Sequence, residues 1–202
     1  MYDVFRLNRK DIILKKDIAR KTYLKKRQEQ VPATFEEESS KLVHNIIALI
    51  EHYKPKCMHC FLPIHSRGEI NTTPIIQYCW ENNIKVLVPV SNFADATLKN
   101  AQFRPHTKTS QTHYNITEPI DPVWEEGNDI DMVITPLLAF DCKGYRVGYG
   151  KGFYDRFFAS LPKEVKRVGI SLFDSCTEIV DISSHDIPLT HCVTPNKTYF
   201  FN

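Results

Sequence analysis

The sequence contains few glycines and no long apolar run. Only seven of the 202 residues are glycine, and no hydrophobic stretch reaches the roughly 18–20 residues that a helix needs to cross a bilayer. The N-terminus has no hydrophobic segment like that of a signal peptide. We therefore expect a cytoplasmic protein that does not bind membranes.

The net charge is small and the cysteines are scattered. A formal charge of +2 does not require a polyanionic partner. The six cysteines show no disulfide framework, because the chain is neither short nor marked for secretion. Cys57 and Cys60 form a C-x-x-C pair within an expected strand, but no second pair completes a zinc site. We predict that these thiols are reduced and structural.

Helical and strand periodicities alternate along the chain. The patterns predict helices over 8–29, 34–53, 73–81 and 152–161, and buried strands over 57–64, 84–90, 131–138 and 167–172. Residues 95–126 are predicted to be irregular, with one short hairpin around 98–103. This alternation indicates a single three-layer α/β domain over 1–202, Rossmann-like, with a mostly parallel central sheet between helices.

Local capping signals define the expected starts of two helices. Thr34 is followed three residues later by Glu37, which is the spacing of a capping box. Thr73 and Pro74 form a cap and first-turn pair. The first helix is instead notable for its charge, since ten of the 26 Lys and Arg residues lie within the first 27 positions.

Four of the seven glycines fall within residues 144–152. Glycine tolerates positive φ and lets backbone N–H groups curl around an anion. Arg146 and Lys151 add positive charge, and the N-terminus of the helix expected from Gly152 also favours anions. Asp155 lies in its first turn, where a metal bridged to phosphate could meet it. The cluster predicts a phosphate-binding loop, although its spacing fits neither a Walker A motif nor the dinucleotide fingerprint.

A second loop, at Gly68–Glu69, follows another expected strand. In parallel sheets, ligands bind outside the carboxyl ends of the strands. We therefore expect this loop and the glycine-rich loop to open on the same edge of the sheet.

Residues 135–156 resemble the signature of the 5-formyltetrahydrofolate cyclo-ligase (5,10-methenyltetrahydrofolate synthetase) family. The resemblance covers nearly the whole chain, and its weaker matches occur in the family's order: Lys16 and Arg20 in a basic helix, 68–70, 114–116, Glu118–Pro119 and His185–Asp186. Asn71 departs from the pattern, because the family often carries an acid there.

The resemblance implies an ATP- and Mg²⁺-dependent conversion of 5-formyltetrahydrofolate to 5,10-methenyltetrahydrofolate, with release of ADP and phosphate. Phosphorylation of the formyl oxygen would make it a leaving group, and N10 would then close the ring. Such a reaction depends on positioning and electrostatic clamping more than on a covalent nucleophile of the enzyme.

The resemblance also implies the roles of individual residues. Lys151 and Arg146 would be catalytic, and Asp155 and Asp186 would hold Mg²⁺. The ATP-binding set would be Lys16, Asp17, Ile18, Ala19, Arg20, Arg146, Val147, Gly148, Tyr149, Gly150, Lys151, Gly152, Phe153 and Tyr154. The folate-binding set would be Leu62, Glu69, Tyr114, Tyr149, Gly150, Lys151, Gly152 and Phe153.

Two other functions fit parts of the sequence. Another α/β enzyme of phosphorylated substrates, such as a kinase or sugar-phosphate isomerase, would use the glycine-rich loop but has no need of Glu69 and Tyr114 together. A nucleic-acid-binding protein would use the basic first helix but leaves the glycine-rich loop without a role. We expect a monomer that binds a small-molecule substrate and no nucleic acid.

Overall fold

The computed structural model describes residues 13–201. Its main feature is an eight-stranded sheet of order β14-β13-β11-β8-β2-β3-β4-β7. The parallel centre consists of β13 (His191–Val193), β11 (Lys166–Ile170), β8 (Met132–Pro136), β2 (Cys57–Cys60) and β3 (Lys85–Asn92). Antiparallel strands flank it: β14 (Thr198–Phe200), β4 (Thr97–Gln102) and β7 (Val123–Glu125). The prediction of a mostly parallel sheet is confirmed.

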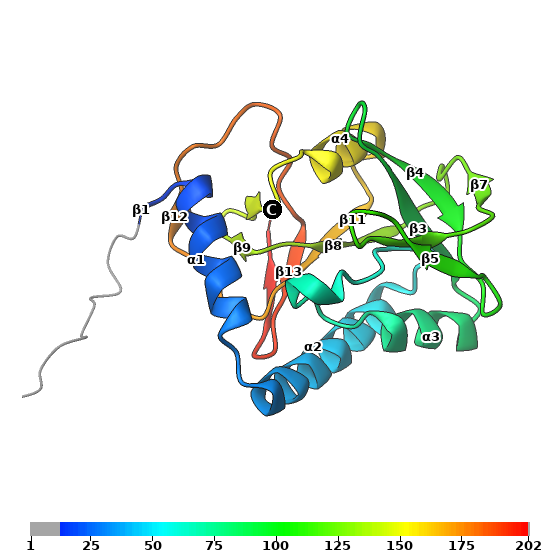
Figure 1. Cartoon of the computed structure of the whole chain (residues 1–202), viewed down its shortest axis with the longest axis horizontal. Coiled ribbons are helices and arrows are strands. Elements are labelled where there is room, and N and C mark those ends of the chain that lie inside the picture. Colours follow the sequence, from blue (N-terminus) through cyan, green and yellow to red (C-terminus); the bar gives the residue numbers. More distant parts are fainter. Residues whose placement is uncertain (1–12, 202) are drawn as a thin grey trace, which may run out of the picture.

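Helices cover both faces of this sheet, as predicted (Figure 1). On one face, α2 (Pro32–Tyr53) and α3 (Thr73–Glu81) pack against the strands, and Leu42, Ile46 and Ile75 are fully buried there. On the other face, α4 (Phe153–Ser160) buries Phe157 and Phe158. Burial on both faces explains why the central strands are continuous apolar runs.

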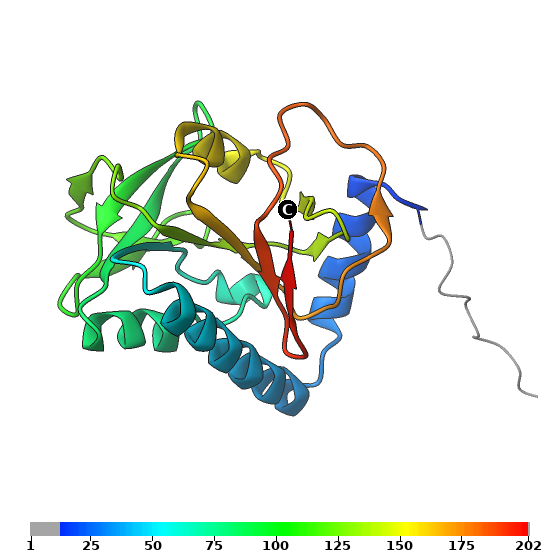
Figure 2. The ribbon, with the colours of Figure 1, turned by 180° about the vertical axis from the view of Figure 1, so that it is seen from behind.

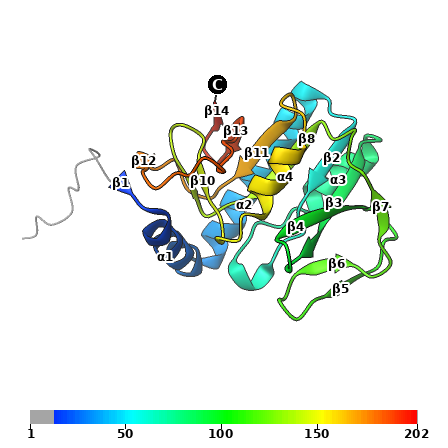
Figure 3. The ribbon, with the colours of Figure 1, turned by 90° about the horizontal axis from the view of Figure 1, so that it is seen from above.

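The basic helix α1 (Lys16–Gln28) lies beyond the β13–β14 end of the sheet (Figures 2 and 3). It packs on two short strand pairs, β1 (Ile13–Leu14) with β12 (Glu178–Ile179), and β9 (Ala139–Phe140) with β10 (Arg146–Val147). Ala19 and Tyr23 are the apolar side chains that α1 buries, whereas Ile18 is 49% exposed. The prediction that this helix extends back through Ile13 and Leu14 is wrong, because these residues form β1, and its predicted start at residue 8 lies outside the described residues.

Residues 95–126 are more regular than predicted. The expected hairpin at 98–103 is instead one strand, β4, paired along its length with β3. Farther on, β5 (Thr109–Gln111) and β6 (Thr117–Pro119) form their own ribbon. All three residues of β5 are exposed, so the segment carries no apolar alternation from which a strand could be predicted.

Neither Thr34 nor Thr73 is an N-cap residue, although Pro74 lies in the first turn of its helix as predicted. Helix α2 begins at Pro32, whose fixed φ suits the first helical position, and its N-cap residue makes no side-chain cap. Glu37 bonds Lys41 at 2.6 Å instead. Helix α3 begins at Thr73, whose N–H donates to Asn71 Oδ1 at 3.0 Å. Within the described residues, none of the helices has the length and apolar character needed to span a membrane.

Candidate active site

Two adjoining cavities open at the carboxyl ends of β2, β3 and β8. The first has a volume of about 270 Å³ and the second about 520 Å³. Five residues line both cavities: Pro136, Tyr149, Lys151, Phe153 and Tyr154. The Tyr149 hydroxyl donates to Glu69 Oε1 at 2.6 Å, so the glycine-rich and Gly68–Glu69 loops meet at one edge of the sheet as predicted.

The glycine-rich loop lines the smaller cavity, and three of its four glycines have positive φ, among them Gly144 at +85°. Gly150 has φ +88° and Gly152, the N-cap residue of α4, has φ +71°, values that other residues rarely adopt. Gly148 differs, because its φ is ordinary and a Cβ there would meet no atom within 4 Å. The space beside Gly148 is therefore open cavity.

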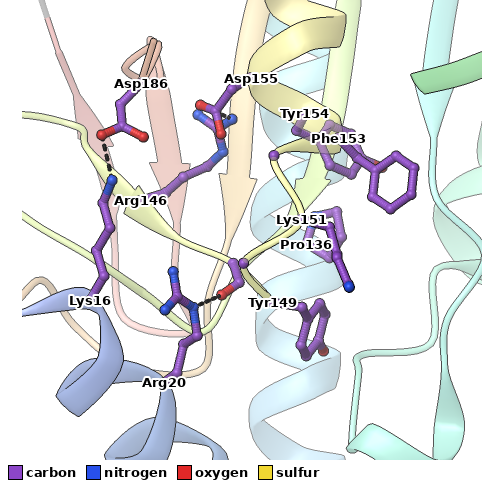
Figure 4. Close-up of a pocket in the computed structure, with 13 residues that line it drawn as sticks. Lys16, Arg20, Pro136, Arg146, Tyr149, Lys151, Phe153, Tyr154, Asp155 and Asp186 are labelled. Atoms are coloured by element: carbon purple, nitrogen blue, oxygen red, sulfur yellow. Dashed lines mark hydrogen bonds and ion pairs between the residues drawn. The ribbon is translucent and has the colours of Figure 1, made fainter. Parts of the chain in front are cut away.

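Helix α1 brings two cations to this loop (Figure 4). The Lys16 ammonium pairs with Asp186, and Arg20 Nε donates to the Gly148 carbonyl oxygen at 3.0 Å. Their spacing of four residues puts both on one helix face, as predicted. Other members of the predicted ATP set lie outside the lining of this cavity: Asp17 and Ile18 are exposed, and Ala19 and Val147 are buried in the core.

Arg146 is largely buried beneath the cavity, with a side chain 6% exposed. Its Nη2 donates to Asp155 Oδ1 at 2.8 Å, and its Nη1 donates to the Ile187 carbonyl oxygen. Its guanidinium carbon also lies 4.7 Å from the centre of the Phe158 ring. Burial lowers the pKa of Arg146, while the Asp155 carboxylate opposes that change and keeps the guanidinium charged.

Asp155 and Asp186 line the same cavity, and each already has a cationic partner. Asp155 Oδ1 also accepts the Ile187 N–H at 3.2 Å, and Asp186 Oδ2 accepts the Ser183 N–H at 2.6 Å. Burial raises the pKa of Asp186, but hydrogen bonds from Lys16 and Ser183 outweigh it and hold that pKa below its usual value. The carboxylate is therefore ionised at neutral pH.

These two carboxylates fit a magnesium ion that arrives with phosphate. Among residues 13–201, no group of three or more acidic, His or Cys side chains could hold a metal by itself. Mg²⁺ needs no such group, since it binds through one or two carboxylates together with substrate phosphates. Asp155 Oδ2 and Asp186 Oδ1 accept no hydrogen bond from the described residues, so one oxygen of each remains available.

The larger cavity is lined mostly by apolar and aromatic side chains, including Phe61, Leu62 and Leu98. Phe93 lies between two rings, with centroids 4.2 Å from Tyr114 and 5.3 Å from Phe153. Tyr114 is 45% exposed at the rim of the cavity. Such walls suit a flat, largely apolar ligand.

Glu69 is the buried acid of this larger cavity, with only 5% of its surface exposed. Its Oε2 accepts the Ile64 N–H at 2.8 Å, and its Oε1 accepts the Tyr149 hydroxyl. Burial raises the pKa of Glu69, and these two hydrogen bonds limit the rise. A carboxylate has about four acceptor positions, so two remain for a ligand.

Several residues in or beside the two cavities were not among the predicted site residues, including Pro136, Phe93, Arg67 and Arg27. Pro136 ends β8, and Phe93 directly follows β3, so the rule that ligands gather at carboxyl ends of strands would have found both. Arg27, seven residues after Arg20, shares its helix face. Arg67 has no comparable signal. It belongs to the short 3₁₀ turn His65–Arg67, and its guanidinium carbon lies 4.4 Å from the centre of the Tyr149 ring.

Comparisons with known proteins identify the family of this chain. A profile of the 5-formyltetrahydrofolate cyclo-ligase family matches residues 12–195. The 5-formyltetrahydrofolate cyclo-ligase of Escherichia coli K12 is 32% identical over 136 residues, which are 65% of this chain and 75% of that protein. The Haemophilus influenzae protein of the same name is 33% identical over 131 residues, 60% of this chain and 67% of its own.

Solved structures show the same architecture. The 5,10-methenyltetrahydrofolate synthetase of Aquifex aeolicus superposes with a TM-score of 0.77 at 26% identity, covering 93% of each chain. The enzyme of the same name from Mycoplasma pneumoniae gives a TM-score of 0.73 at 20% identity, covering 90% of this chain and 99% of its own, which shows likeness of fold. Profile, sequence relatives and structure together establish that the chain belongs to the 5-formyltetrahydrofolate cyclo-ligase family.

Proposed function

We propose that this protein catalyses the ATP-dependent closure of 5-formyltetrahydrofolate to 5,10-methenyltetrahydrofolate, with release of ADP and phosphate. The observation that carries the proposal is the position of Lys151. Of the cations that line the two cavities among residues 13–201, it is the one common to both. A charge at that junction can neutralise a phosphoryl group during its transfer from one ligand to the other.

The smaller cavity supplies the features that a triphosphate requires. Lys16, Arg20, Arg146 and Lys151 line it together with the glycines of the loop. We propose that Mg²⁺ enters with the nucleotide and is held by Asp155 and Asp186, where it would offset phosphate charge. Each acid would hold it through the oxygen that its ion pair leaves free, and Lys16 and Arg146 would add positive charge beside the phosphates.

The larger cavity supplies the features that a reduced pterin requires. The two acceptor positions left on Glu69 match the parallel N–H donors of a 2-amino-pyrimidine edge. Phe93, Tyr114 and Phe153 offer apolar faces for the flat ring. In this arrangement the formyl group lies toward Lys151.

The chain's own residues do no covalent chemistry in this scheme. The γ-phosphoryl group passes to the formyl oxygen, N10 attacks the activated carbon, and phosphate leaves with that oxygen. Lys151 would stabilise the charge on the transferring group, and Arg146 would support it from below the loop. The six free thiols are typical of a reducing compartment, so we also propose a cytoplasmic location.

The test is direct conversion by the purified protein. With MgATP and 5-formyltetrahydrofolate we expect the near-ultraviolet absorbance of the methenyl product to appear, with one ATP consumed per product. Omitting ATP or chelating Mg²⁺ should each stop it. ATP consumption on another substrate, with 5-formyltetrahydrofolate left unchanged, would show that the assignment is wrong.

A further inference from the structure

Arg27 is a buried cation that lies outside the lining of both cavities. It lies in the last turn of α1 with 8% of its surface exposed. Its Nη2 donates to the Leu137 carbonyl oxygen at 2.7 Å, and its Nη1 donates to the Tyr149 hydroxyl at 3.2 Å. Burying a guanidinium is costly unless it is hydrogen-bonded, so these two bonds define where the side chain sits.

The hydrogen bond from Arg27 to Tyr149 is followed by a second hydrogen bond, from Tyr149 to Glu69. The Tyr149 hydroxyl accepts from Arg27 and donates to Glu69 Oε1, while the Ile64 N–H holds Oε2. A continuous hydrogen-bonded chain thus runs from α1, through the glycine-rich loop, to the loop that carries Glu69. Arg27 and Arg67 are also the positive charges that oppose the burial-driven rise in the pKa of Glu69.

Packing reinforces this connection at Gly68. Its φ is +62°, and a Cβ built there would lie 3.0 Å from Arg27 Cγ and 3.2 Å from Cδ. The backbone just before Glu69 therefore rests directly on the Arg27 side chain. The end of α1 sets the position of this loop by contact as well as by hydrogen bonding.

We propose that Arg27 is a positioning residue for folate binding, which fixes Tyr149 and through it orients the Glu69 carboxylate. The inference rests on the proposed function, because it assigns Glu69 to the pterin. Arg27 touches neither ligand in this scheme. Its effect reaches the substrate only through the Tyr149 hydroxyl.

A double-mutant cycle tests this dependence. Arg27→Met should raise KM for 5-formyltetrahydrofolate about tenfold, which lies within the usual range of couplings between sites, and should change kcat far less. Tyr149→Phe should have a similar effect, because it removes the connecting hydroxyl. The double variant should then resemble either single one. Lys25→Met, on the exposed side of the same helical turn, is the matched control and should leave KM unchanged.

Two further readouts separate positioning from general stability. Without Arg27, the acidic limb of the kcat/KM profile should move to higher pH, because the Glu69 carboxylate loses a stabilising charge. Arg27→Lys should return the acidic limb to its wild-type pH but should lower the raised KM only in part. A lysine keeps the positive charge but cannot make both hydrogen bonds of the guanidinium. If Arg27→Met fails to fold, Arg27→Lys and Tyr149→Phe still complete the comparison.

Additive effects in the cycle, or an unmoved acidic limb, would overturn the role of Arg27 while leaving the proposed function intact. A wild-type protein that does not convert 5-formyltetrahydrofolate would overturn the proposed function itself. The two failures are therefore distinguishable.

Discussion

At the scale of single residues, the site contains two kinds of cation: one exposed to the cavities and one buried and hydrogen-bonded within the protein. Lys151 is exposed on the loop and lines both cavities, whereas Arg146 is buried and bonded to Asp155 and Ile187. Removing each should therefore have a different consequence. A loss at Arg146 would leave a carboxylate without its partner, but a loss at Lys151 removes charge alone.

Lys151→Ala should lower kcat by about 10²–10³-fold, the usual effect of deleting one group that stabilises transition-state charge. Its melting temperature should stay near that of the wild type, because the side chain is exposed. Lys163→Ala, also exposed and in the loop after α4, is the control and should retain full turnover. Near-normal turnover in folded Lys151→Ala would remove Lys151 from the reaction.

Folate affinity should depend on pH through Glu69. The ionised carboxylate is the form that accepts two pterin N–H groups, and burial raises its pKa above the ordinary 4.5. Affinity is therefore complete above the raised pKa and is lost as pH falls through it. Calorimetric titration at a series of pH values should show this limb at a higher pH than an exposed carboxylate would give. Glu69→Gln should bind more weakly and show no such limb.

At the scale of elements, the sequence predicts the interior better than the edges. The central strands are apolar on both faces and the helices have regular apolar spacing, so their hydrophobic periodicity is unambiguous. Strands β5 and β7 are three residues each and mostly exposed, so they show no hydrophobic alternation that would predict a strand. The glycine-rich loop was predictable because its residues are adjacent in sequence.

The contacts between loops were not predictable. Arg27 and Tyr149 are 122 positions apart, and Tyr149 and Glu69 are 80 apart. No local pattern specifies such pairs, because they arise only when the sheet brings the strand ends together. The glycine-rich loop could therefore be located from the sequence alone, and the hydrogen-bonded chain from Arg27 through Tyr149 to Glu69 could not.

Two glycines of the loop should respond differently to alanine. Gly150→Ala places a side chain at φ +88° and 3.2 Å from the Arg20 guanidinium, so it should lower the free energy of unfolding by about 1–3 kcal/mol. Gly148→Ala meets no atom, so its stability should stay within about 0.5 kcal/mol of wild type. Its methyl group would nevertheless enter the smaller cavity, where we propose that ATP binds, and raise KM for ATP. Urea denaturation and ATP kinetics measure both effects, and equal destabilisation would contradict this account.

At the scale of the whole molecule, buried histidines make the fold sensitive to acid. His59 lies within β2 beneath α4, its ring centroid 4.6 Å from that of Phe157, and burial lowers its pKa to about 3. His191 bonds Tyr53, and burial lowers its pKa to about 4. Both are neutral in the folded protein at neutral pH.

The free energy of unfolding should therefore fall on acidification. Below the ordinary histidine pKa of 6.5 the unfolded chain binds protons that the folded one does not, until pH falls to about 3 for His59. Each such histidine contributes a slope of about 1.4 kcal/mol per pH unit in that window. His59→Leu should flatten the dependence, and His106→Gln, at an exposed histidine, should not. Denaturation curves at a series of pH values check this, and an unchanged slope in His59→Leu would exclude the residue as the cause.

Helix α1 lines the smaller cavity at one end, through Lys16 and Arg20, and supports Glu69 at the other, through Arg27. In the proposed scheme one helix contacts both ligand sites, so the two binding affinities are coupled reciprocally. The ligand that binds first bears the entropic cost of ordering the helix. The second then binds to a helix already held in place. Each ligand would consequently raise the affinity for the other by the same factor, whichever is added first, without altering a single direct contact.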